Sequence, residues 1–393
     1  MKVAFLTTDN RDQLKDYTAA NPCFGPAPEA LLEGFALLPD VEVHVVSCAR
    51  QKMTSPEKVA PNIFFHCLHV PKIGWMRTLF QGCVRAVRTK LKEIQPDIVH
   101  GQGTEGHNAL AAICSCFPNV VTIHGNMADL ARQFQEPVGS YNWLAGKLET
   151  FALKRTCGVL CNSAFTEQLV KPRARRTWRV PNALRGIFFA APPTTGLAGR
   201  CTLVSIGVIA VRKRQLELLD VANELRRQGF DFEFKFAGEA CATNAYVSAF
   251  LERIKPLERE GIARYIGPRP GSELVQLFDQ SAGMVHFSPA ESFGLAVAEG
   301  LARDLKLFTA RVGGVPDIAA SVPGAELFDM GDWPGLTSAI ARWIRSGFPR
   351  ACGAGKVMRA RYEPEHIALQ HIEIYREVLG RAGPASGDRR AMR

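Results

Sequence analysis

Two carboxylates and the turn between them are well suited to hold a phosphorylated, hydroxyl-rich ligand. Glu291 follows an apolar run, 284–287, that predicts a buried strand, and seven residues separate it from Glu299. Ser-Pro before Glu291 and Phe-Gly after it indicate a tight turn into a helix. The unpaired N–H groups at a helix start attract anions, and a carboxylate accepts two hydrogen bonds from a vicinal diol such as ribose. The alternative is an ordinary strand–turn–helix with exposed acids.

A second group of residues follows the predicted strand 202–206. It contains a glycine and then two cations, Gly207, Arg212 and Lys213. Fixed cations after a strand can stabilise the charge that develops on a leaving diphosphate without a metal ion. The alternative is a solvated basic turn.

These motifs, with Gly313-Gly314-Val315-Pro316-Asp317 after them, resemble the E-x7-E pattern of retaining glycosyltransferases of family GT4, which have the GT-B fold. The resemblance implies that Glu291 lies near the donor sugar and that Glu299 binds the nucleotide ribose. It also implies that the backbone of the turn faces the donor sugar and its phosphates, at Phe293, Gly294 and Leu295.

The same resemblance implies roles for residues outside the turn. Lys213, with Gly207 before it, would bind the diphosphate, and Gly238 would let the backbone approach the nucleotide closely. His124 stands in a His-Gly pair after the predicted strand 119–123, and by the resemblance it would contact the sugar. The alternative is that His124 has only a structural role. His100 and His107 rank below His124.

Two positions depart from the family pattern. Val208 stands where the family has an arginine after the glycine, and we expect Arg212 to supply the missing guanidinium. The N-terminal loop contains Cys23-Phe24-Gly25-Pro26 in place of a Gly-Gly pair, which leaves the acceptor site open.

The length and composition predict two globular domains. The chain has 393 residues, of which 47% are hydrophobic and 22% charged. The net charge of +10 favours anionic partners but does not choose among nucleotide-sugars, acidic membranes and nucleic acid. Eleven scattered cysteines without a C-x-x-C predict reduced core thiols rather than zinc or disulfides. Reduced thiols of this kind are expected of a cytoplasmic protein, and no apolar run reaches the roughly 20 residues of a membrane span.

Strand and helix patterns alternate along the chain and predict an α/β fold with two Rossmann-like, doubly wound domains facing a central cleft, the GT-B fold. Strands are expected at 1–8, 41–46, 62–69, 97–101, 119–123, 158–161, 178–180, 202–206, 233–237, 264–266, 283–287, 306–309 and 326–328. We expect an N-terminal, acceptor-side domain at 1–189, a linker at 190–200 and a donor-side domain at 201–362. A terminal helix at 363–380 follows, which by resemblance crosses back to the N-terminal domain. Residues 381–393 are expected to form a flexible tail.

The predicted helix 77–94 has basic residues on one arc and apolar residues, Leu79 among them, on the other. Such a helix suits the surface of an anionic membrane. The favoured alternative is a helix packed on the sheet with a solvated basic face. Peripheral contact with the inner face of a membrane is therefore left open.

Together these features predict a retaining, metal-independent glycosyltransferase with no cofactor. Its donor would be a nucleotide diphosphate sugar, UDP- or GDP-linked, and its acceptor a hydroxyl group of unknown identity. No nucleic-acid partner is expected. The alternatives are a nucleotide-sugar epimerase of the GT-B fold and a non-catalytic ligand-binding protein that kept the fold.

Overall fold

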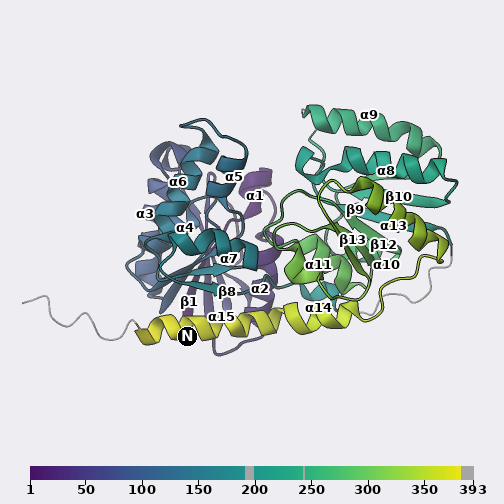
Figure 1. The fold of residues 1–393 in the computed structure, drawn as a ribbon. Coiled ribbons are helices and arrows are strands. Elements are labelled where there is room, and N and C mark those ends of the chain that lie inside the picture. The colour runs from purple at the N-terminus through teal and green to yellow at the C-terminus, as the bar shows by residue number, and fades with distance from the viewer. Residues whose placement is uncertain (191–198, 242–243, 382–393) are drawn as a thin grey trace, which may run out of the picture. The chain divides into compact units, whose positions relative to one another are not determined.

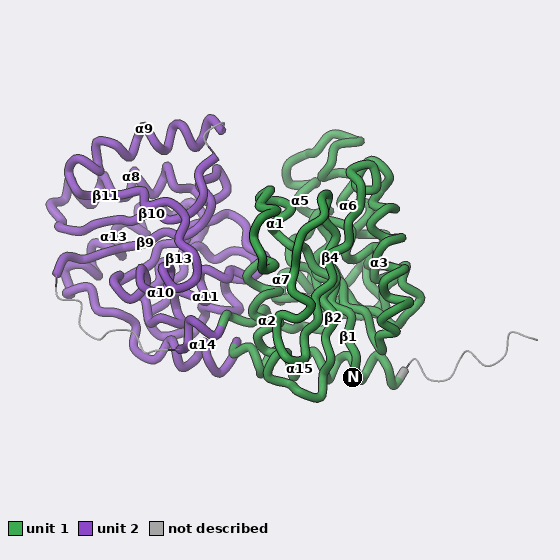
Figure 2. Tube along the Cα trace, turned by 180° about the vertical axis from the view of Figure 1, so that it is seen from behind, with its two compact units in different colours: residues 1–185, 363–393 green, residues 186–362 purple. Residues whose placement is uncertain are grey.

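The described chain folds into two α/β units in a computed structural model (Figure 1). The structure describes residues 1–190, 199–241 and 244–381. Unit 1 comprises Met1–Arg185 and the described residues from Glu363 onward, and unit 2 comprises Gly186–Tyr362 (Figure 2). Most of the predicted linker 190–200 and almost all of the predicted tail lie outside the described residues.

Unit 1 contains an eight-stranded sheet whose strands are parallel except at one edge. In spatial order the strands are β3 (Lys58–Ala60), β4 (Ile63–His69), β2 (Glu42–Ala49), β1 (Lys2–Leu6), β5 (Ile98–Gln102), β6 (Asn119–Ile123), β7 (Val159–Cys161) and β8 (Thr177–Arg179). The chain runs outward from β1 in both directions, so the topological switch point lies between β1 and β5. The antiparallel edge strand β3 was not predicted, because three residues are too few to show a period.

The α-helices of unit 1 cover both faces of this sheet. They are α1 (Asn10–Leu14), α2 (Pro26–Ala36), α3 (Gln81–Ile94), α4 (Asn108–Ile113), α5 (Met127–Gln133), α6 (Tyr141–Leu153), α7 (Ala164–Val170) and α15 (Pro364–Arg381). Alternate residues of β1 enter different cores: Val3 and Phe5 pack with α2 and α15, whereas Ala4 and Leu6 pack with α3 and α4. The period-2 alternation of a strand therefore produces the layers.

The helix α15 packs against α2 within unit 1. A Cβ on Gly34 would lie 2.1 Å from the carbonyl oxygen of Pro364, so the two backbones touch at a position that admits only glycine. Tyr375 of the same helix is fully buried and hydrogen-bonds His100. Unit 2 begins at Gly186, earlier than the predicted start at 201, because Phe188 packs on Phe278.

Unit 2 contains a six-stranded sheet of parallel pairs. In spatial order the strands are β11 (Ala263–Gly267), β10 (Phe232–Ala237), β9 (Cys201–Ile206), β12 (Gly283–His286), β13 (Lys306–Ala310) and β14 (Ala325–Phe328). The helices are α8 (Gln215–Arg227), α9 (Ala245–Arg259), α10 (Gly271–Asp279), α11 (Leu295–Ala302), α12 (Val315–Ala319), α13 (Trp333–Arg345) and α14 (Ala354–Tyr362). This strand order is that of a doubly wound fold with its switch point between β9 and β12.

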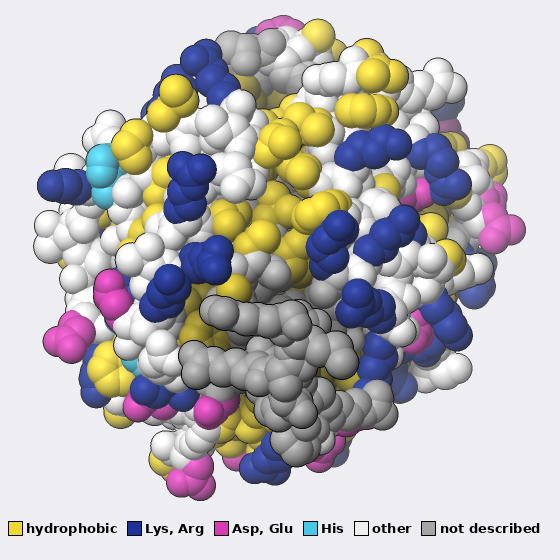
Figure 3. Space-filling view, turned by 90° about the vertical axis from the view of Figure 1, so that its left-hand side faces the viewer, with side chains coloured by type: hydrophobic (Ala, Val, Ile, Leu, Met, Phe, Trp, Pro, Cys, Tyr) yellow, Lys and Arg dark blue, Asp and Glu magenta, His cyan; other side chains and the backbone are white. Residues whose placement is uncertain are grey.

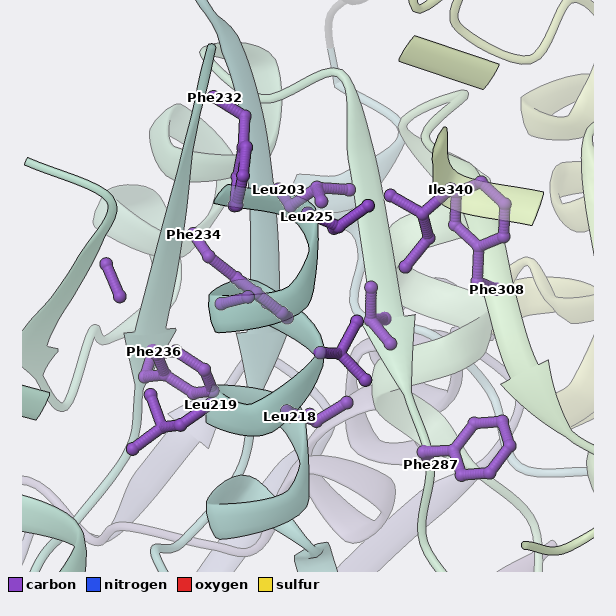
Figure 4. Close-up of a cluster of buried hydrophobic side chains, with 14 of the residues drawn as sticks. Leu203, Leu218, Leu219, Leu225, Phe232, Phe234, Phe236, Phe287, Phe308 and Ile340 are labelled. Carbon is purple, nitrogen blue, oxygen red and sulfur yellow. The ribbon is translucent and has the colours of Figure 1, made fainter. Parts of the chain in front are cut away.

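A fully buried aromatic and aliphatic cluster fixes α8 on the sheet of unit 2. Phe232, Phe234 and Phe236 of β10 belong to one cluster with Leu218, Leu219 and Leu225 of α8 (Figure 4). Packing of α8 also fixes the loop that leads into it from β9, and this loop carries the predicted cations.

The predicted helix 77–94 starts later than expected. Leu79 and Phe80 have φ of +51° and +62°, so the chain leaves the short 3₁₀ turn η2 (Met76–Thr78) and α3 begins at Gln81. The apolar side of α3 is buried against the sheet, as the favoured alternative predicted. Leu79, placed on that apolar arc by the sequence, is instead 42% exposed.

Candidate functional site

The predicted donor-site residues of unit 2 gather at the switch point of its sheet. Lys213 lies in the 3₁₀ turn η5 (Val211–Lys213), in the loop after β9, and Glu291 lies in the loop after β12. Because β9 and β12 are neighbouring parallel strands, both loops emerge at the same edge of the sheet. Ligands of open α/β sheets bind at this position.

Lys213, Glu291 and His286 form one hydrogen-bonded group. Lys213 Nζ forms an ion pair with Glu291 Oε1, and the two side chains are only 12% and 14% exposed. His286, the last residue of β12, contacts the same oxygen through Nε2 at 2.9 Å. Among the described residues, the hydrogen bonds of this carboxylate therefore fall on Oε1, and Oε2 is left for a ligand.

The charge state of this group follows from burial and its internal contacts. Burial lowers the pKa of His286, so we assign a neutral ring that donates Nε2–H to Glu291. Burial by itself would raise the pKa of Glu291, but the hydrogen bond from His286 and the charge of Lys213 outweigh it and lower that pKa well below its ordinary value. Glu291 is therefore an anion held by a lysine and an imidazole.

Two neighbouring segments hold the backbone of the Glu291 turn. The buried Ser288 donates its hydroxyl to the carbonyl oxygens of Arg212 and Ala290, both at 3.0 Å, and so joins the two loops. Gly314 N–H donates to the carbonyl oxygen of Glu291 at 2.9 Å. A Cβ on Gly313, whose φ is +53°, would lie 1.8 Å from that same oxygen. Close backbone contact therefore requires glycine at position 313.

Gly313→Ala is expected to displace the Glu291 turn. The added methyl cannot fit against the carbonyl oxygen, and alanine in the left-handed region adds strain on the order of 1–3 kcal/mol. Thermal unfolding should show a clear loss of stability, whereas Gly271→Ala, where nothing lies within 4 Å, should leave the melting temperature nearly unchanged. Equal stability of the two variants would show that the turn is not fixed in this way.

The loop after β9 is fixed by two glycines and a buried glutamine. Gly207 and Gly238 have φ of +143° and +153°, and a Cβ on Gly238 would lie 1.9 Å from the carbonyl oxygen of Gly207. Gln215, 2% exposed at the start of α8, accepts from Ala210 N–H at 3.2 Å and donates to the carbonyl oxygen of Val208 at 3.0 Å. Sequence analysis assigned no role to Gln215 or His286, because a buried polar side chain shows its role only through its partners.

The two arginines beside Lys213, Arg212 and Arg214, differ in whether they form an ion pair. Arg214 pairs with Glu217 on α8 at 2.7 Å. Arg212 is exposed, and it makes no ion pair with any residue that the structure describes. Its guanidinium is therefore available to an anion, and its role as a substitute for the arginine missing at Val208 stays a prediction. Val208 itself is 44% exposed.

The remaining predicted residues lie in or beside α11. Gly294, with φ of +107°, is the N-cap of this helix, and Leu295 is its first residue. The Phe293 side chain is buried in contact with the ring of Tyr362, so it is not the side chain that could meet a ligand. Glu299 lies within α11 and is 6% exposed.

The predicted histidine of unit 1 belongs to a separate network. His124, after β6, donates from Nε2 to Gln102 Oε1 at 2.9 Å, and Gln102 contacts His100 at 2.9 Å through its amide nitrogen. The buried His100 also contacts Thr122 Oγ1 at 2.7 Å. Burial lowers the pKa of His124 to about 4, so the ring is neutral. Because Nε2 carries the proton in this arrangement, Nδ1 is the hydrogen-bond acceptor.

Two carboxylates that sequence analysis missed order the loops of unit 1. Glu105, after β5, accepts the Gly125 N–H at 2.8 Å, and burial raises its pKa. Asp9, after β1, forms a fully buried ion pair with Arg11 and accepts the Cys23 N–H at 3.2 Å. This pair fixes the N-terminal loop that lacks the Gly-Gly pair of the family.

Comparison with known proteins identifies both units. Residues 34–184 match the Glycosyltransferase Family 4 model, and residues 196–354 match that of the Glycosyl transferases group 1. A D-inositol 3-phosphate glycosyltransferase of Corynebacterium urealyticum is 31% identical over 146 residues, which are 34% of this chain and 34% of that protein. The chain thus aligns with about a third of the length of this curated relative.

Solved structures with the same fold span nearly the whole chain. Sucrose-phosphate synthase from Thermosynechococcus elongatus superposes with a TM-score of 0.76 at 16% identity, over 97% of this chain and 100% of that one. Anabaena Alr3699/HepE in complex with UDP-glucose superposes with a TM-score of 0.71 at 17% identity, over 96% and 100%. The two Rossmann-like units therefore have the GT-B fold, and the N-terminal unit is similar to glycosyltransferase family 4 over residues 34–184 and the C-terminal unit to the glycosyl transferases group 1 over residues 196–354.

Proposed function

We propose that this protein transfers a sugar from a nucleoside diphosphate sugar to a hydroxyl acceptor, with retention of configuration and without a metal ion. The observation that carries the proposal is the ion pair of Lys213 and Glu291, which lie in the loops after two neighbouring strands at the switch point of unit 2. One is a fixed cation for a diphosphate, and the other is a fixed anion for sugar hydroxyls.

Unit 2 would bind the donor. Lys213 and the exposed Arg212 would neutralise the diphosphate, and the N–H groups at the start of α11 would bind its oxygens. Glu299 would hold the ribose. Gly207 and Gly238, which have no side chains, would let the nucleotide approach the backbone.

The reaction would develop negative charge on the leaving diphosphate, and pre-positioned cations stabilise such charge. The Lys213 ammonium takes the role that a metal ion has in other transferases, which supports metal independence. Glu291 is a poor nucleophile because its carboxylate is ion-paired and its pKa is lowered. This supports a same-face displacement in which an oxygen of the leaving phosphate takes the acceptor proton. Glu291 Oε2 would then orient the donor sugar.

Unit 1 would bind the acceptor. His124 is neutral with Nδ1 as its acceptor atom, so it would receive a hydrogen bond from a sugar hydroxyl. The donor base is proposed to be uracil, because the Alr3699/HepE structures contain UDP and UDP-glucose. GDP is the competing choice.

A thermal-shift panel of UDP, GDP, ADP, CMP and dTDP tests the donor assignment. A ligand at about 100 times its Kd stabilises the folded protein by about 2.7 kcal/mol, which gives a readable shift. We expect UDP to give the largest shift without added metal and in the presence of a chelator. A shift that requires a divalent ion would contradict metal independence, and the absence of a shift with every nucleotide would contradict the donor site.

Incubation with the matching nucleotide-sugar distinguishes the alternative functions. Transfer to an acceptor alcohol with the anomeric configuration kept is expected. Epimerised donor without an acceptor would indicate the epimerase, and tight binding without turnover would indicate the non-catalytic protein.

We also propose a peripheral contact between unit 1 and an anionic membrane surface, at the cytoplasmic side where the free cysteines of the chain stay reduced. No helix in the described part of the chain has the length and apolarity to cross a bilayer. Ile73 and Leu79 are 68% and 42% exposed, next to the exposed Lys72 and Arg77. Lys and Arg side chains are prominent on the face in Figure 3. Apolar side chains flanked by cations suit an interface with acidic lipid.

Ile73→Ser/Leu79→Ser is expected to reduce this contact. Sedimentation with vesicles containing phosphatidylglycerol should pellet the wild type and leave most of the variant in solution. Val138→Ser, at an 82% exposed position in another loop of unit 1, is the matched control. Wild-type protein that stays in solution at low ionic strength would contradict the contact.

A further inference from the structure

Two thiols and an imidazole from distant parts of the sequence meet in the interior of unit 1. Cys48 lies near the end of β2, Cys83 in the first turn of α3, and His107 directly before α4. Their exposed fractions are 1%, 0% and 3%. Their ligand atoms, the two Sγ atoms and one ring nitrogen, all lie within 4.8 Å of one another.

The imidazole of His107 has a buried ring nitrogen, Nε2, without a hydrogen-bond partner among the described residues. The ring contacts the aromatic rings of Trp75 and Phe80, which give it no acceptor. A buried polar atom without a partner costs about 1–3 kcal/mol, so its persistence calls for a ligand.

We propose that Cys48, Cys83 and His107 bind a thiophilic metal ion, with Zn²⁺ as the ion expected. Zinc takes thiolate and imidazole ligands in tetrahedral sites, with Zn–S of about 2.3 Å and Zn–N of about 2.0–2.1 Å. Ligand atoms around such an ion lie roughly 3.5–3.8 Å apart, so inward shifts of an ångström or less would close the site. Binding releases the two thiol protons to solvent, and water fills the fourth position.

The ion would join the end of β2 to α3 and to the loop that precedes α4. That loop also carries Glu105, which holds the backbone N–H of Gly125 beside His124. If the proposed function is correct, the metal fixes the position of the acceptor-side loop that carries Glu105 and takes no part in sugar transfer. The assignment of the metal site itself does not depend on that function.

Metal analysis of the purified full chain tests the proposal. After reconstitution with Zn²⁺ and removal of free ion, the wild type should hold about one zinc per chain. Cys83→Ser and Cys48→Ser should hold little. The matched control is Cys161→Ser, which changes a fully buried thiol on β7 of the same unit and should keep the zinc.

Cobalt substitution gives a second readout that reports thiolate ligation directly, compared among variants that keep the wild-type circular dichroism. Co²⁺ bound to two thiolates gives a sulfur-to-metal charge-transfer absorption, which should appear in the wild type and in Cys161→Ser but not in Cys83→Ser. Zinc-free wild type after reconstitution, or equal zinc in Cys83→Ser, would overturn the site. So would a Cys48–Cys83 disulfide in peptides mapped without reduction. Transfer activity is not a readout, so failure of the proposed function would not affect this result.

Discussion

Lys213→Ala is expected to abolish the thermal shift given by the preferred nucleotide and to lower kcat/KM for transfer by about 10²–10³-fold. The Lys213 ammonium is the largely buried cation at the switch point, and once it is removed only the exposed Arg212 is left beside the proposed diphosphate position. The ligand-induced shift is the quantity to compare, because the variant also leaves the Glu291 carboxylate without its counter-ion and is expected to melt at a lower temperature.

Lys306→Ala is the matched control for this variant. Lys306 forms a comparable ion pair with Glu326 in the same unit, and its side chain is 14% exposed. It lies at the start of β13, whereas the proposed donor site lies at the opposite ends of the strands. Its variant should lose stability but keep the full nucleotide shift. A full shift in Lys213→Ala would show that the diphosphate binds elsewhere.

Glu291→Gln is expected to separate binding from transfer. The amide preserves the shape of the side chain but frees Lys213 from its counter-ion, so the nucleotide should bind as tightly as to the wild type or more tightly. Transfer should fall by about 10²-fold, because the sugar is no longer oriented by an anion. Calorimetry with the nucleotide and initial rates with the nucleotide-sugar measure the two effects.

The control for this variant is Glu326→Gln, which removes the carboxylate of the Lys306 pair and should change neither nucleotide binding nor transfer. Loss of nucleotide binding in Glu291→Gln would assign Glu291 a structural role. Wild-type transfer in Glu291→Gln would remove it from the site altogether.

The pH dependence of stability provides a further comparison for the same variant. The pKa of Glu291 is lower in the folded protein than its ordinary value of 4.5, so the folded state binds this proton less readily than the unfolded state. Its contribution to stability is therefore present above pH 4.5 and is lost as the pH falls below that value. Glu291→Gln should lack this component of acid destabilisation.

The sequence by itself determined the two α/β units and the positions of nearly all their strands. The apolar runs of β1, β9 and β12 reflect burial on both faces of a parallel sheet, which local residue types record directly. It also located Lys213 and Glu291 in loops after strands, because turn residues such as Gly207 and Gly294 mark those points. The short antiparallel β3 and the start of α3 were missed, since left-handed residues at Leu79 and Phe80 carry no local signal.

Only the tertiary structure decided which side chains meet. The pairing of β9 with β12 joins residues 213 and 291, and it places His286 on the same carboxylate oxygen. The sequence predicted no zinc ligands, yet the layering of α3 and α4 on one face of the sheet brings Cys48, Cys83 and His107 together. Spacing in the sequence reports local periodicity, whereas contacts between distant residues depend on strand order and on which face each helix covers.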